Sequence, residues 1–155
     1  MQCSNLSMGI GVVASVVCLG IAKDAHAEIQ NAFINTRGDI EIEFVDNAPP
    51  TRAFDYHGRA QVEAKYVCAR GNRVQPRRQE TVAIVIERTE RFAADFQGRV
   101  HGVLTLNQPI GQASLRCQGS FSVQLASVRY TQIEIQSELG MSLFPRDIER
   151  NFLAR

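Results

Sequence analysis

The chain has 155 residues and a formal net charge of +1, from 17 basic and 16 acidic side chains. This length suits one domain that buries its own core. Because basic and acidic side chains are nearly equal in number, the chain has no overall attraction to nucleic acid or to an anionic membrane, and we expect neither as a partner.

An apolar run opens the chain from Met8 to Ala22, and Ala25-His26-Ala27 follows it closely. This is the outline of a secretory signal peptide cleaved after Ala27, because a membrane-spanning helix needs about 20 apolar residues. We therefore predict a signal peptide over residues 1–27 and one exported extracellular domain over residues 28–155. No Lys or Arg precedes the run, so an uncleaved anchor and a misplaced start are the alternatives.

Removing residues 1–27 leaves two cysteines, Cys68 and Cys117. Two cysteines in an oxidising compartment are expected to pair. In the chain-entropy model, closing a loop of this size is worth about 4 kcal/mol. The alternatives are two buried free thiols or a metal site. No histidine cluster lies near them in the sequence, so we predict neither a metal nor a cofactor.

Hydrophobic residues recur mainly with a period of two, which indicates β-strands. The first clear strand covers residues 39–45 and ends before Pro49 and Pro50. Its expected core face is Ile40, Ile42 and Phe44, and its expected solvent face is Asp39, Glu41 and Glu43. The same alternation over residues 60–68 places Cys68 on the inward face.

Residues 81–86 are apolar on nearly both faces, which favours a central strand over an edge strand. A turn at residues 95–98 is predicted next, because Gly98 accepts the positive φ that such a turn needs. The turn leads into a strand over residues 99–106.

The pattern changes phase in the last third of the chain. Val128 and Tyr130 share one parity and Ile133 and Ile135 the other, which predicts a β-bulge near Thr131 or a change of sheet. Residues 144–153 fit a short helical turn, since two apolar side chains there are spaced i,i+4. Short strands at this spacing predict an antiparallel, immunoglobulin-like β-sandwich, with a small β-barrel as the alternative.

Several motifs occur together between residues 60 and 135. In chain order they are Tyr66-Val67-Cys68, Glu80-Thr81-Val82, Gly98, Gly102-Val103-Leu104-Thr105-Leu106, Cys117 and Leu125 to Thr131. With them the chain resembles a family of small secreted, disulfide-bonded β-sandwich proteins of unknown function from soil bacteria and filamentous fungi. It departs from that family after Cys68, where a basic segment replaces a Gly-rich loop, and after Cys117. The resemblance implies the same fold and bridge, and no catalytic residues.

Four arginines, Arg70, Arg73, Arg77 and Arg78, lie within nine residues of a predicted loop. Guanidinium groups bind phosphate, sulfate or carboxylate groups through paired hydrogen bonds. The loop is therefore a candidate contact for an anionic surface polymer or another protein, and the alternative is a solvated loop without a ligand. No aromatic residue is interleaved for base stacking, which argues against nucleic acid.

Two histidines remain after cleavage, His57 and His101, and they would serve acid-base chemistry only if the fold brought them together. The acidic stripe of residues 39–43 is a calcium candidate, but carboxylates on one strand face lie about 7 Å apart, which favours a solvated face. The absence of Trp argues against a sugar platform, and the tyrosines fit core packing.

These observations predict a secreted, non-catalytic binding or interaction module of unknown ligand, with its loops as the contact surface. An extracellular hydrolase that uses His57 and His101 is one alternative. A structural component of the cell envelope is the other.

Overall fold

The computed structural model describes residues 27–153, and this part of the chain is almost entirely β-structure. The predicted signal peptide lies outside the described residues except for Ala27. The strands are β1 (Glu28–Ile34), β2 (Ile40–Asn47), β3 (Ala53–Arg70), β4 (Arg73–Ala93), β5 (Arg99–Leu106), β6 (Ser122–Ser137), β7 (Gly140–Leu143) and β8 (Ile148–Asn151), with one 3-10 turn at Ile110–Gln112. Over these residues we find no helix with the length and hydropathy needed to span a membrane.

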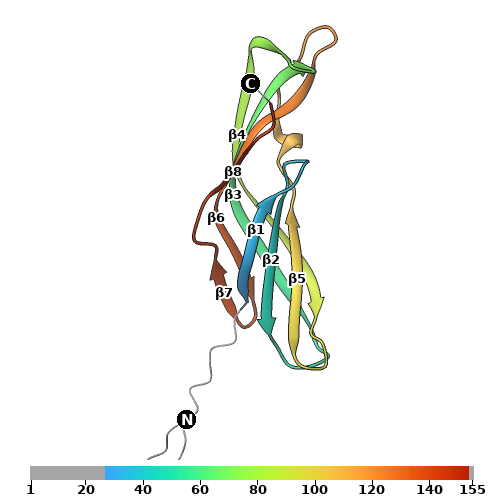
Figure 1. Ribbon diagram of the computed structural model, residues 1–155, viewed down its shortest axis with the longest axis vertical. Helices are drawn as coiled ribbons and strands as arrows, with labels where there is room; N and C mark the ends of the chain where they lie inside the picture. Colours follow the sequence, from blue (N-terminus) through green and yellow to red (C-terminus); the bar gives the residue numbers. More distant parts are fainter. Residues whose placement is uncertain (1–26, 154–155) are drawn as a thin grey trace, which may run out of the picture.

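Two antiparallel sheets pack face to face (Figure 1). The first has the order β1-β2-β5, and the second has the order β4-β3-β6-β7, with β8 also paired to β6. No strand pair in the described residues joins the two sheets, so the fold is the predicted sandwich and not the alternative barrel. The strand order differs from that of the constant-type immunoglobulin fold, in which the fourth strand pairs with the fifth. In this protein β4 pairs with β3.

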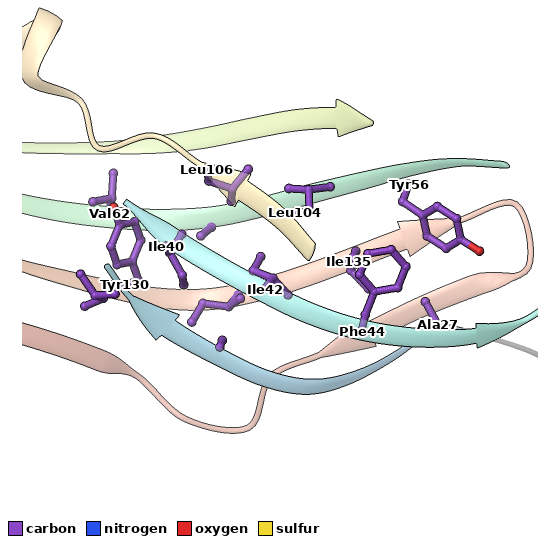
Figure 2. Close-up of a cluster of buried hydrophobic side chains, with 14 of the residues drawn as sticks. Ala27, Ile40, Ile42, Phe44, Tyr56, Val62, Leu104, Leu106, Tyr130 and Ile135 are labelled. Carbon is purple, nitrogen blue, oxygen red and sulfur yellow. The ribbon is translucent and has the colours of Figure 1, made fainter. Parts of the chain in front are cut away.

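The core lies between the sheets and follows the predicted alternation (Figure 2). Residues from β2 and β5 face residues from β3 and β6, and those drawn in Figure 2 include Ile40, Ile42, Phe44, Tyr56, Val62, Leu104, Leu106, Tyr130 and Ile135. Phe44, Tyr56 and Phe92 form an aromatic cluster, with ring centroids 4.6 Å apart for the first two. The inward faces predicted for residues 39–45 and 60–68 are confirmed.

The hairpin of β3 and β4 extends beyond the three-stranded sheet, at the upper end of Figure 1. There the loop of residues 107–121 packs against the long sheet, and its Leu115 joins the margin of the core. The predicted bridge between Cys68 and Cys117 is present, with Cα atoms 5.4 Å apart, and it fastens this loop to β3. The loop therefore supports a part of the sheet that the first sheet leaves uncovered.

Strand β6 contains two irregularities, one of which the sequence predicts. Gln132 has a φ of +48°, and the register with β3 shifts between Thr131 and Glu134, which confirms the bulge expected near Thr131. A second shift falls at Ala126, between the partners of Lys65 and Tyr66. The two bulges together turn three successive groups of apolar side chains toward the same core.

Two predictions about individual segments are wrong. Residues 81–86 belong to β4, which is an edge strand because, among the strands of residues 27–153, it pairs only with β3. Apolar residues on both faces of a strand do not show whether a second strand pairs with its other edge. Residues 148–151 form strand β8 instead of a helical turn, because the exposed edge of β6 offers hydrogen-bonding partners to an extended chain.

Asp39 also differs from its prediction, since it is only 6% exposed and does not lie on a solvated acidic face. Its carboxylate accepts a hydrogen bond from the Gln108 backbone (3.1 Å) and lies 3.4 Å from the Arg37 guanidinium. The residue ends the turn between β1 and β2, where the turn's geometry overrides strand alternation.

Candidate functional site

The four arginines lie on the extended hairpin and not in an irregular loop as predicted. Arg70 and Arg73 are directly paired across a two-residue turn, Gly71-Asn72, in which Gly71 has a φ of +56°. A tight turn with positive φ matches the twist of the two strands, so β3 and β4 continue to the tip. The arginines are therefore held on a regular β-scaffold.

A large bulge interrupts β4 just after the tip. Val74 pairs with Ala69 and Gln79 pairs with Val67, so residues 75–78 stand opposite the single residue Cys68. This segment contains Pro76, which has no N–H to donate, and Arg77, whose φ is +58°. The bulge lifts Arg77 and Arg78 out of the strand ladder.

The loop of residues 107–121 braces the hairpin from one side. The Arg70 guanidinium donates to the Ser120 hydroxyl (2.8 Å). Both the backbone N–H and the hydroxyl of Ser114 donate to the Glu80 carboxylate, each at 2.9 Å. The disulfide and these contacts fix the hairpin's orientation, and Ser114 engages the acidic group that lies closest along β4.

The positive charges of the hairpin are not neutralised by carboxylates in the described part of the chain. No carboxylate in residues 27–153 forms an ion pair with Arg70, Arg73, Arg77 or Arg78. All but Arg78 are exposed, and Arg78 is half-buried. Elsewhere in the same range, arginines of the long sheet do form ion pairs, for example Arg129 with Asp147 at 2.5 Å.

A fifth arginine, Arg116, reaches the same end of the molecule through the disulfide, because it precedes Cys117. It is exposed. Sequence reasoning missed it because it lies 38 positions from Arg78 along the chain. The predicted pairing of the cysteines was the signal that places it beside the hairpin.

We call Arg70, Arg73, Arg77, Arg78 and Arg116 together the arginine hairpin. The hairpin of β3 and β4, which carries four of them, protrudes beyond the first sheet (Figure 1). A depression of about 560 Å³ lies on the outer face of the long sheet, and none of these arginines lines it. Its lining residues are Gln61, Val62, Glu63, Ala83, Ile84, Val85, Arg129 and Thr131. A protruding cationic surface is suited to an extended anionic partner, whereas a small ligand needs an enclosing cavity.

The two histidines are on different sheets. His57 on β3 hydrogen-bonds the Thr89 hydroxyl (3.0 Å) and lies 3.6 Å from the Glu87 carboxylate. His101 on β5 lines a separate depression beside Asp46. The two histidines lie on different sheets and His57 does not line the depression that contains His101, so the described structure does not bring them together for acid-base chemistry.

The acidic stripe does not converge either. Glu41 accepts a hydrogen bond from the Asn35 side chain (2.9 Å), and Asp39 is turned into the loop contact described above. No group of three His, Cys, Asp or Glu residues suited to a metal ion occurs in the described part of the chain.

The three tyrosines are buried, as the predicted core parity of Tyr66 and Tyr130 requires. Each hydroxyl donates to a group outside its own strand: Tyr56 to Asp46, Tyr66 to Gln108, and Tyr130 to the Gly38 carbonyl. Burial raises the pKa of Tyr66 to about 12, and it also raises the pKa of Tyr130. The tyrosines are structural and offer no sugar platform.

Comparison with known proteins finds no matching family model, no matching curated protein and no matching solved structure. The resemblance to small secreted β-sandwich proteins therefore stays a prediction.

Proposed function

We propose that this protein is an exported, non-catalytic binding module that contacts an anionic surface polymer through its arginine hairpin. The observation that supports this most directly is the group of mostly exposed arginines, on a braced, protruding hairpin, that pair with no carboxylate of residues 27–153. Retained surface charge that is not used internally is available for a partner.

The chemistry of the partner follows from the guanidinium group. Its planar set of donors matches the oxygen pairs of sulfate, phosphate and carboxylate groups. A polymer that repeats such groups engages several arginines at once, and each contact adds to the affinity. Flat aromatic rings, which base stacking would require, are absent from the hairpin segment 70–78.

Export is the second part of the proposal. It is supported by the apolar leader with its Ala25-His26-Ala27 site and by the disulfide, which persists in an oxidising compartment. Strand β1 begins at Glu28, immediately after the predicted cleavage site. Sequencing the amino terminus of the exported protein tests this part directly, and a first residue other than Glu28 would contradict the predicted site.

A heparin column tests the contact surface, since heparin is a repeating sulfated polymer. We expect the double variant R73Q/R77Q to elute at clearly lower salt than the parent, because each lost charge contact removes part of a salt-dependent affinity. The matched control is R52Q/R99Q, which removes two exposed arginines at the opposite end of the sandwich.

The control variant has the same net charge as the hairpin variant. Once the effect of this lower charge on elution is allowed for, the control should elute close to the parent. If both variants elute together, the interaction follows net charge alone and the arginine hairpin is not the contact surface. Circular dichroism spectra that match the parent's would show that both variants keep the fold.

A further inference from the structure

The outer edge of β4 is open along its middle. Between the Ser114 contact at Glu80 and the contact of Arg88 with the Thr105 carbonyl (3.3 Å), no backbone group of residues 81–87 bonds to a described strand other than β3. An open edge presents a row of unpaired N–H and C=O groups to another extended chain.

This stretch also lacks the features that usually protect an edge. Charged side chains, prolines and bulges discourage edge pairing, and β4 places them outside residues 81–86, at the bulge of residues 75–78 and from Glu87 onward. Residues 81–86 are uncharged and rich in β-branched side chains. On their outer face Ala83 is exposed and Val85 is 43% exposed.

The strand is complementary to itself in antiparallel register. When Ile84 of one copy stands opposite Ile84 of a second, Ala83 faces Val85 and Glu80 faces Arg88. The two neighbouring registers that keep the same faces together lose this charged pair, since one places Glu80 opposite Ile86 and the other places Glu80 opposite Glu90. Charge therefore selects one register.

We propose that the protein forms a symmetric dimer in which the β4 edges of two copies pair around Ile84. The twofold axis passes beside this residue, and the two long sheets join into one continuous sheet. The pair of Glu80 and Arg88 occurs twice, as the symmetry requires. The antiparallel pairing places the two arginine hairpins at opposite ends of the dimer.

Sedimentation equilibrium over a range of concentrations tests this proposal, with variants at two outer-face positions. The variant A83K/V85K places Lys opposite Lys twice across the interface, and it should raise the dimer dissociation constant at least about tenfold. The variant A83K/V85E places Lys opposite Glu in the same positions and should restore the parent's constant to within about threefold.

These substitutions are tolerated within one copy because both positions are exposed, and their β3 partners are Glu63 and Gln61. If the parent stays monomeric up to about 1 mM, or if A83K/V85K and A83K/V85E dimerise equally well, the proposal is wrong.

A measurement on the unaltered chain applies even if a variant fails to fold. Amide hydrogen exchange should slow at the outward-pointing N–H groups of residues 81–87 as protein concentration rises through the dissociation constant, because pairing protects the groups that do not bond to β3. Exchange that is independent of concentration over that range would overturn the proposal.

Discussion

Two glycines lie where core side chains from other strands require their space. A Cβ on Gly102 of β5 would overlap the Phe44 ring, and one on Gly58 of β3 would lie 2.6 Å from Leu104. Neither glycine has a positive φ, so backbone freedom does not explain them. The sequence shows Gly102 only as a break in an alternating strand, and the packed structure shows that the missing side chain makes room for an aromatic ring.

Substituting Gly102→Ala should therefore destabilise the protein by about 1–3 kcal/mol, because the buried ring has to move within a close-packed core. Urea unfolding followed by circular dichroism measures the change. The control is Gly111→Ala, where an added Cβ meets nothing within 4 Å, and it should stay within about 0.5 kcal/mol of the parent. Equal stability of the two variants would contradict this account of the packing.

At the scale of the element, the hairpin extension depends on the loop of residues 107–121. Alternation predicted the inward face of Cys68, and the count of cysteines predicted its partner. The sequence did not show that β4 begins at Arg73, because the bulge at residues 75–78 and its proline hide the strand pattern there. Strand β1 was also missed, because the shift of its register with β2 between Ile29 and Asn31 interrupts its alternation.

Removing the bridge should loosen this extension. The variant C68S/C117S should lose about 4 kcal/mol of unfolding free energy, because the unfolded chain is no longer constrained by the cross-link. Trypsin should also cleave after Arg116 faster than in the parent, since the loop loses its covalent attachment to β3. Unchanged stability and cleavage rate would show that the side-chain contacts of Ser114 and Ser120 suffice.

At the scale of the whole molecule, buried tyrosines connect the sheets with their loops. Tyr56 reaches Asp46 of β2, at 3.0 Å, from the opposite sheet, and Tyr130 reaches the Gly38 carbonyl in the turn between β1 and β2, at 2.6 Å. Burial raises the pKa of all three tyrosines, and hydrogen bonding to Asp46 raises that of Tyr56 further. Ionisation of any one of them opposes the folded state.

Stability should therefore fall at alkaline pH. A folded-state pKa above the unfolded value of 10.0 contributes stability that is complete below pH 10 and is lost as pH rises toward the folded value, which is about 12 for Tyr66. Phenolate absorbance should stay low while the fold persists and rise together with unfolding, because the chain has only these three tyrosines and no Trp. Gradual ionisation near pH 10 in folded protein would contradict this prediction.

The sequence by itself determined the strand character, most inward faces, the main turn at residues 95–98 and the cysteine pairing, because these depend on local periodicity and on counting. The tertiary structure alone decided that residues 81–86 form an edge and that Asp39 is buried. Each of these depends on which strands become neighbours, and a period of two is the same in a central strand and in an edge strand.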